Sequence, residues 1–125
     1  MIAGSVPLQS ETQDKIYNAC LVYDDQGILV ARYNKIHLFG LNLGNETYHE
    51  EKTITPGNQV VTVDSPFGKI GLSICYDLRF PELYRSLGQV DCHVIPAAFT
   101  YTTGKDHWEI LLRSRAIENQ CYVLA

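Results

Sequence analysis

The sequence lacks the features of several protein classes. No apolar run approaches the roughly 18 residues that a membrane-spanning helix needs. There is no block of basic residues, and ten Lys and Arg stand against fourteen Asp and Glu, for a net charge of −4. Because phosphate binding depends on clustered cations, this balance disfavours a nucleic-acid partner. The first residues lack the basic start and apolar stretch of a signal peptide. We therefore expect a cytoplasmic protein without nucleic-acid or membrane partners.

Cysteine and histidine are scarce and widely spaced. The four cysteines are Cys20, Cys75, Cys92 and Cys121, and no two of them form a C-x-x-C pair. In a cytoplasmic protein we interpret them as free thiols rather than as disulfides. The histidines also lack the close pairing of a zinc site; they are His37, His49, His93 and His107. We expect no metal site and no cofactor.

The remaining composition is that of a globular domain, with 46% hydrophobic and 19% charged residues in a chain of 125. Apolar spacing and turn signals predict a hairpin at 19–33, a long loop at 40–58, a hairpin at 60–74, a helix at 80–88, a strand at 93–95, a loop at 96–104, a helix from Lys105 and a strand at 121–125. This order is typical of a layered α/β fold. The last strand is cut at its end, so we expect residues 1–125 to be one partial domain.

Cys75 differs from the other cysteines in its surroundings. It ends the apolar run 70–74 and precedes the polar residues 76–79, which lead into the predicted helix. A residue at such a strand-to-helix turn projects into a cleft near backbone N–H groups, which favour a thiolate and can hold an oxyanion. Cys75 is therefore a candidate nucleophile, although most free cysteines are small buried hydrophobic residues. The other three lie in apolar strands and are interpreted as core residues.

A nucleophilic cysteine needs a base and a charge partner. His37 or His107 could form a Cys–His pair with Cys75. Lys35 follows the first predicted hairpin and Glu50 lies in the long loop. Taken singly, a lysine or a glutamate in such a place is more often a solvated surface charge.

Three motifs, taken together and in order, carry a family resemblance. They are the segment 34–39 around Lys35, the Glu50 loop that ends at Pro56-Gly57, and the segment 71–82 around Cys75. With the segments 96–99, 103–109 and 113–119, they resemble the nitrilase superfamily of carbon–nitrogen hydrolases, and most closely its branch of deaminated-glutathione amidases and ω-amidases. The resemblance covers essentially the whole chain. It implies an α/β fold, a nitrilase-like α-β-β-α sandwich that is here incomplete at both ends, and a homodimer in the intact protein.

The resemblance also implies an activity: hydrolysis of the C–N bond of a small amide that carries a carboxylate, through a cysteine thioester. Cys75 is then the nucleophile and Lys35 the cation beside the oxyanion. Glu50 corresponds to a supporting glutamate that orients the lysine or positions the substrate. We expect Lys35→Ala to slow the reaction by roughly 100-fold and to leave the melting temperature nearly unchanged.

Further residues are implied in substrate binding. The backbone N–H of Tyr76 would share the oxyanion with Lys35. Arg79 could bind the substrate carboxylate with its guanidinium fork, or it could instead pair with Asp77 or Glu82. Three threonines of the second predicted loop could line the pocket, although ordinary loop chemistry explains each of them singly; they are Thr100, Thr102 and Thr103. Trp108, Arg115 and Glu118 are interpreted as packing residues and structural polar partners.

One element of the family's Glu-Lys-Cys triad is missing from the expected place. The general-base glutamate precedes the first hairpin in the family, and the acidic residues there are Glu11 and Asp14, in a polar segment without the expected apolar strand. We expect the base to lie outside this chain, so that the fragment alone is inactive. A non-catalytic binding module remains the alternative, and a Cys–His peptidase is the weakest interpretation because it leaves the Lys35 motif unexplained.

Overall fold

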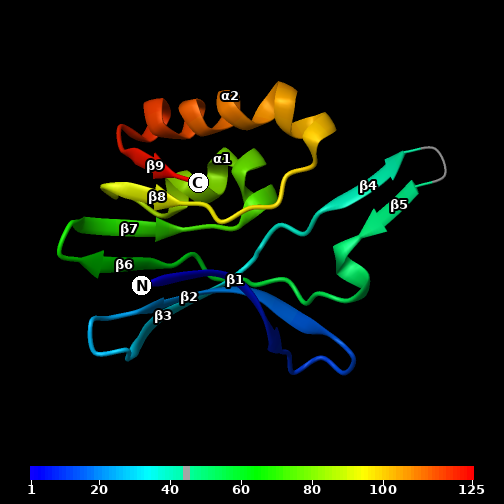
Figure 1. The fold of residues 1–125 in the computed structure, drawn as a ribbon, viewed down its shortest axis with the longest axis horizontal. Coiled ribbons are helices and arrows are strands. Elements are labelled where there is room, and N and C mark those ends of the chain that lie inside the picture. The colour runs from blue at the N-terminus through cyan, green and yellow to red at the C-terminus, as the bar shows by residue number, and fades with distance from the viewer. Residues whose placement is uncertain (44–45) are drawn as a thin grey trace.

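Two β-sheets lie face to face, and two helices cover one of them, in the computed structural model, which describes residues 1–43 and 46–125 (Figure 1). The first sheet is antiparallel with the order β1-β2-β3, formed by β1 (Ile2–Gln9), β2 (Ile16–Tyr23) and β3 (Leu29–Asn34). The second sheet has the order β6-β7-β8-β9, formed by β6 (Thr62–Ser65), β7 (Gly68–Leu72), β8 (Cys92–Val94) and β9 (Tyr122–Leu124). The pair β6–β7 is antiparallel, whereas β7–β8 and β8–β9 are parallel.

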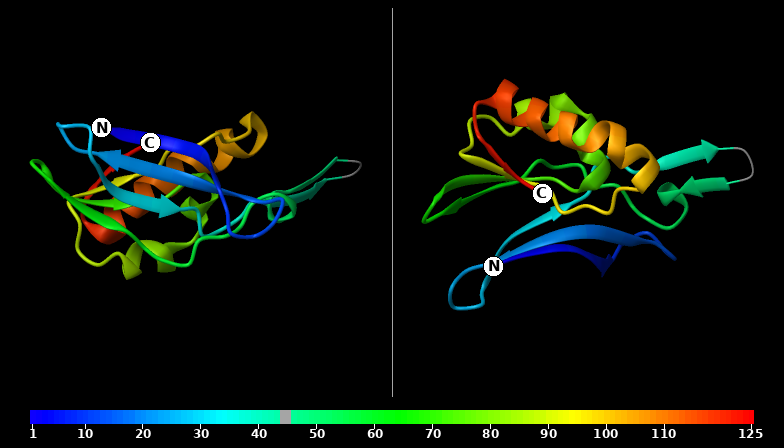
Figure 2. Two further views of the ribbon diagram at one scale, coloured as in Figure 1. Left: turned by 90° about the horizontal axis from the view of Figure 1, so that it is seen from below. Right: turned by 45° about the horizontal axis from the view of Figure 1, so that its top comes forward.

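The helices connect the parallel strands of the second sheet. Helix α1 (Pro81–Ser86) leads from β7 to β8, and α2 (Tyr101–Asn119) leads from β8 to β9. Both lie on the side of the second sheet that faces away from the first (Figure 2). Within the described ranges, no helix covers the outer face of the first sheet, so the layers are helix, sheet and sheet. The predicted α/β class is confirmed, and the predicted four-layer sandwich is present in part.

One hydrophobic core joins these layers. It combines Cys20 and Tyr33 of the first sheet with Leu72 of the second sheet and with Leu83 and Tyr84 of α1. These five side chains are buried, with exposed fractions of 4% or less. The prediction that Cys20 is a core residue is confirmed.

Both predicted hairpins are confirmed. In the first, β2 and β3 flank a turn in which Asp24 Oδ1 accepts the backbone N–H groups of Gln26 (2.9 Å) and Ile28 (2.8 Å). Gly27 takes φ of +77°, which glycine adopts without steric cost. The second hairpin is β6–β7. The predicted short helix is confirmed as α1, with Pro81 in its first turn.

Two strand regions differ from the sequence prediction. Strand β1 was not expected, because Gly4 and Pro7 interrupt its apolar alternation. Among the described residues it is an edge strand that pairs with β2, and proline is tolerated in an edge strand. The prediction of a loop throughout 40–58 is wrong. Strands β4 (Gly40–Leu43) and β5 (Glu46–His49) form an antiparallel hairpin, followed by the 3₁₀ helix η1 (Glu50–Lys52).

The β4–β5 hairpin projects away from the two sheets (Figure 1). Residues 44 and 45 of the predicted loop lie outside the described residues. The hairpin escaped prediction because each of its strands has only 4 residues, and its apolar alternation is limited to Leu41 and Leu43 in an otherwise polar stretch.

Helix α2 begins at Tyr101, four residues before the predicted start at Lys105, so the predicted loop at 96–104 ends at Thr100. The carbonyl of Thr100 accepts the N–H of Gly104 at 2.8 Å, and the Thr100 and Thr103 hydroxyls share a hydrogen bond at 2.8 Å. Threonine and glycine are poor helix formers, and this local bonding explains why the first turn is helical. In the residues described, no helix has both the length and the apolar content to cross a membrane.

Candidate active site

Cys75 lies at a strained turn where the second sheet meets a 3₁₀ helix. It is the first residue of η2 (Cys75–Arg79), shortly after β7, and its φ is +50°, a region that non-glycine residues rarely occupy. Its backbone N–H donates to the carbonyl of Pro96 at 3.0 Å. The N–H of Ile74 donates to Asp77 Oδ2 at 2.9 Å. The turn is therefore fixed on both sides of the half-buried thiol.

Lys35 is one of the most buried side chains in the structure, with 1% of it exposed. Its backbone is held from two directions, since its N–H donates to Asn18 O and its carbonyl accepts from Gly57 N, each at 2.8 Å. A side chain at Gly57 would place its Cβ 2.1 Å from the carbonyl oxygen of Asn34, so glycine is required for this close approach. The segment after η1 thus fixes the position of Lys35.

The Lys35 ammonium donates to Glu50 Oε2 at 2.6 Å. The same oxygen accepts the backbone N–H of Phe39 at 2.7 Å, and the Glu50 side chain is 11% exposed. Removing two charges from water is costly, and each partner of such a pair becomes an uncompensated buried charge when the other is lost. Lys35 and Glu50 therefore form a structural unit, and the interpretation of either as a solvated surface charge is wrong.

All six predicted site residues line a single cavity of about 750 Å³; they are Lys35, Glu50, Cys75, Tyr76, Arg79 and Thr103. Its wall also includes aromatic side chains from three segments, namely Phe39, Tyr48 and Phe99. The backbone N–H of Tyr76 is paired with no acceptor among the described residues, so it can donate to a ligand. A concave site that combines apolar walls with a few convergent polar groups is typical of small-molecule binding.

Arg79 lies among aromatic side chains at the cavity. Its guanidinium carbon lies 5.8 Å from the ring centre of Tyr76 and 5.6 Å from that of Phe99, and Nη2 is 3.2 Å from His107 Nδ1. In the described ranges it pairs with neither Asp77 nor Glu82, so the ion-pair alternative is not supported. Of the three threonines considered, Thr100 and Thr103 line the cavity and Thr102 does not.

Neither candidate histidine is placed for a Cys–His pair. His37 Nδ1 lies 2.8 Å from Asp77 Oδ1, and its ring stacks on Phe80 with centroids 3.7 Å apart. His107 contacts Arg79. In the part of the chain that the structure describes, neither histidine lines the cavity of Cys75. This geometry disfavours the peptidase interpretation.

Comparison with known proteins decides the family. The family described as carbon–nitrogen hydrolase matches residues 1–125 in full. The chain belongs to this family, the nitrilase superfamily. It is 47% identical to the ω-amidase NIT2 of Homo sapiens, over 98% of this chain and 45% of that protein. It is 48% identical to the deaminated glutathione amidase of Yersinia enterocolitica, over 98% of this chain and 44% of that protein.

A solved structure gives the same result for the fold. Nit3 of Saccharomyces cerevisiae, a member of branch 10 of the nitrilase superfamily, matches with a TM-score of 0.84 and 39% identity, over 98% of this chain and 42% of that chain. This carbon–nitrogen hydrolase chain therefore spans less than half the length of these relatives and forms a partial nitrilase fold.

The acidic residues near the N-terminus lie away from the cavity of this carbon–nitrogen hydrolase chain. Neither Glu11 nor Asp14 lines it. Glu11 accepts the Tyr17 hydroxyl at 2.6 Å, and this hydrogen bond lowers the pKa of Glu11. Where side chains are described, Glu50 is the one acidic residue in the cavity wall. No cluster of three or more His, Cys, Asp or Glu that could hold a metal ion occurs among the described residues.

The surroundings of the other three cysteines raise the pKa of their thiols. Burial raises the pKa of Cys20 to about 11. Burial also raises the pKa of Cys92 and of Cys121, which are half-buried rather than fully within the core. A thiol with a raised pKa is a poorer nucleophile at neutral pH, because the thiolate is the attacking species.

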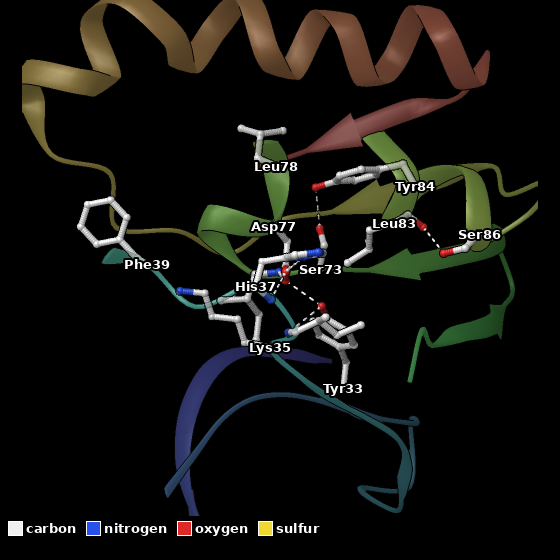
Figure 3. A network of polar contacts seen from close by, with 12 residues as sticks. Tyr33, Lys35, His37, Phe39, Ser73, Asp77, Leu78, Leu83, Tyr84 and Ser86 are labelled. Atoms are coloured by element: carbon white, nitrogen blue, oxygen red, sulfur yellow. Dashed lines mark hydrogen bonds and ion pairs between the residues drawn. The ribbon is translucent and has the colours of Figure 1, made fainter. Parts of the chain in front are cut away.

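Sequence reasoning missed part of the site. Gly4 and Ser5 of β1 line the cavity, as does Asn18 of β2. Because no strand was predicted at β1, there was no reason in the sequence to assign Gly4 and Ser5 to the site. Asp77 was considered only as a partner for Arg79, yet it is fully buried and lies at the centre of a hydrogen-bond network (Figure 3). Its place in the 71–82 motif was the one available sign of a role.

Proposed function

We propose that this chain carries the nucleophile and the oxyanion site of an amidase that hydrolyses a small, carboxylate-bearing amide. The observation that carries the proposal is the placement of Cys75, Lys35 and Glu50 in one cavity, with the lysine buried and held by the glutamate. A buried cation is costly in a protein, and a charge that stabilises an oxyanion is a chemical use that fits such a position.

The proposed reaction has two stages. The Cys75 thiolate attacks the amide carbon, and the carbonyl electrons move to oxygen, where the Lys35 ammonium and the Tyr76 N–H stabilise the oxyanion. The carbonyl then re-forms, the C–N bond breaks, and the nitrogen takes a proton and leaves as ammonia. Water attacks the resulting thioester, the C–S bond breaks, and the carboxylic acid leaves the regenerated thiol.

Both stages need a base that removes a proton first from the thiol and then from water. Glu50 is a poor candidate because the carboxylate already accepts the Lys35 ammonium and the Phe39 N–H. We propose that Glu50 orients Lys35 and that the general base is a carboxylate from outside residues 1–125.

We propose that Arg79 binds the substrate carboxylate and that Thr103, which lines the same cavity, contributes to substrate binding. Arg79 has no carboxylate partner among the described residues, and its guanidinium plane can bind a carboxylate through two parallel hydrogen bonds. The ω-amidase and deaminated glutathione amidase relatives support a small linear amide as the substrate class.

We also propose a homodimer for the intact protein. Apolar side chains on α2 and β9 are exposed in the single chain, and burial of such residues is a common basis for association; they are Ile110, Ile117, Tyr122 and Leu124.

The test is ammonia release from a short dicarboxylic acid monoamide by the full-length protein and by its Cys75→Ala variant. We expect turnover by the first and none by the second. A Cys75→Ala variant with normal turnover would refute the role of Cys75, and a folded full-length protein without turnover would favour the non-catalytic binding module. Residues 1–125 alone should release no ammonia, and turnover by them would show that the base lies within this chain.

A further inference from the structure

A single buried carboxylate connects the segment of Lys35 with the segment of Cys75. Asp77 is 0% exposed. Its Oδ2 accepts the Tyr33 hydroxyl at 2.7 Å and the Ile74 N–H at 2.9 Å. Its Oδ1 accepts the His37 N–H at 2.9 Å and lies 2.8 Å from His37 Nδ1. Figure 3 shows Asp77 with Tyr33, His37 and Lys35.

The partners of Asp77 flank both proposed reacting groups. Tyr33 and His37 lie two residues before and two residues after Lys35, and Ile74 directly precedes Cys75. Lys35 follows β3 of the first sheet, whereas Cys75 follows β7 of the second. Asp77 therefore forms a side-chain bridge between the two sheets at the point where each delivers its reacting residue.

Asp77 does not itself reach the substrate. It is absent from the wall of the cavity, whereas Lys35 and Cys75 line it. Lys35 Nζ bonds to Glu50 and not to Asp77, so Glu50 orients the ammonium and Asp77 holds the backbone segment that carries it. A buried carboxylate requires its hydrogen-bond donors, and this requirement fixes the distance between the two segments.

We propose that Asp77 is a positioning residue that sets the Lys35 ammonium against the Cys75 thiol. This proposal rests on the proposed function, in which the two groups act on one substrate carbonyl. The relative position of reacting groups strongly affects the rate, because even a small displacement from the productive geometry slows the reaction.

The readout is the ratio of the rates at which Cys75 reacts with iodoacetate and with iodoacetamide in the full-length protein. The two reagents differ in charge, so a cation beside the thiolate accelerates the anionic reagent selectively. The ratio needs no turnover and therefore no general base. A Lys35→Met variant calibrates it by removing the ammonium.

The test variant is Tyr33→Phe, and the matched control is Tyr84→Phe. Tyr33 and Tyr84 are both 0% exposed, and each has a buried hydroxyl hydrogen bond. The Tyr33 hydroxyl also accepts the Ile36 N–H at 3.3 Å, so Tyr33→Phe removes both contacts of this hydroxyl with the segments of Lys35 and Cys75. The hydroxyls of Tyr84 and Ser73 share a hydrogen bond at 3.0 Å (Figure 3). This bond connects α1 with the segment that precedes Cys75, rather than with the segment of Lys35. A general loss of packing or stability affects both variants, whereas a loss of positioning affects only Tyr33→Phe.

We expect Tyr33→Phe to lower the reagent ratio toward that of Lys35→Met, by about threefold or more. It should also lower kcat by about 10-fold or more with little change in KM. Tyr84→Phe should leave both the ratio and kcat unchanged within about twofold, whatever its effect on Tm. An unchanged ratio in folded Tyr33→Phe, or an equal fall in both variants, would overturn the proposal.

A second variant covers the case in which Tyr33→Phe does not fold. His37 is only partly buried, and His37→Phe keeps an aromatic ring against Phe80 while it removes the Nδ1 contact with Asp77. The same fall in the ratio is expected, and its absence would overturn the proposal. If the full-length protein releases no ammonia but the ratio responds as expected, the proposed function fails and the positioning role of Asp77 stands.

Discussion

Replacement of Lys35 by methionine separates the stability of the site from its chemistry. Methionine has nearly the length of lysine but no charge, so Lys35→Met leaves the Glu50 carboxylate with the Phe39 N–H as its remaining donor. Loss of one partner of a buried ion pair costs about 3–5 kcal/mol. Glu50 keeps this donor and an exposed fraction of 11%, which reduces the expected cost to about 2–3 kcal/mol.

This cost has a measurable consequence for thermal unfolding. In a large single domain, each kcal/mol corresponds to about 2–4 °C, so the melting temperature of the full-length protein should fall by roughly 4–12 °C. The nearly unchanged melting temperature expected from the sequence for Lys35→Ala is therefore revised, because the sequence did not show that Lys35 is 1% exposed. Loss of the charge at the oxyanion should also slow turnover by about 100- to 1000-fold.

The double variant Lys35→Met/Glu50→Gln is the control. Glutamine retains an oxygen for the Phe39 N–H and removes the unpaired buried charge, so it should recover much of the lost stability. It should recover none of the rate, because no cation faces the oxyanion. The assays are thermal denaturation and ammonia release. An unchanged melting temperature in Lys35→Met, or a double variant that regains turnover, would refute the reasoning.

Three other predictions follow from the geometry. Iodoacetamide labelling mapped by mass spectrometry should modify Cys75 well before Cys20, Cys92 and Cys121, since burial raises the pKa of those three; equal labelling of all four in the native protein would contradict the assignment of Cys75. Arg79→Lys should raise KM for a carboxylate-bearing amide more than for a neutral amide of similar size, because a point charge does not replace a bidentate fork; an equal rise for both would show that Arg79 holds the loop instead. Burial lowers the pKa of His93 from 6.5 to about 4, so the unfolded chain binds more protons between these values and stability should fall as the pH drops through this range, by at most about 3 kcal/mol. Urea denaturation at pH 7 and pH 4.5 should show a smaller fall in His93→Leu, and an equal fall in both proteins would exclude His93 as the source.

The local sequence was sufficient to predict those elements that depend on contacts between neighbouring residues. The first hairpin follows from apolar strands around Asp24 and Gly27, which make the turn through contacts within four residues. Helix α1 follows from Pro81 at its start, and Gly88 lies shortly after its end. These elements make their hydrogen bonds between near neighbours or show a regular spacing of apolar residues. Their structure can therefore be predicted from the local sequence.

The missed elements depend on partners elsewhere in the chain. Strand β1 is stabilised by pairing with β2 rather than by an apolar pattern of its own. The β4–β5 hairpin is stabilised by backbone pairing, and the alternation of Leu41 and Leu43 in β4 is too short to predict a strand. The first turn of α2 uses Thr100 and Gly104 in a helical arrangement, although both residue types favour loops.

The sequence by itself determined which residues are candidates for the chemistry, because the motifs around Lys35, Glu50 and Cys75 occur together and in order. Only the tertiary structure decided that Lys35 is buried against Glu50, that Arg79 faces His107 instead of a carboxylate, and that Asp77 bridges the two segments. The Tyr33–Asp77 bond spans 44 positions and the Lys35–Glu50 bond spans 15. Contacts at such separations depend on how the two sheets pack, and the energetic importance of a charge depends on its exposure to water, which no local pattern records.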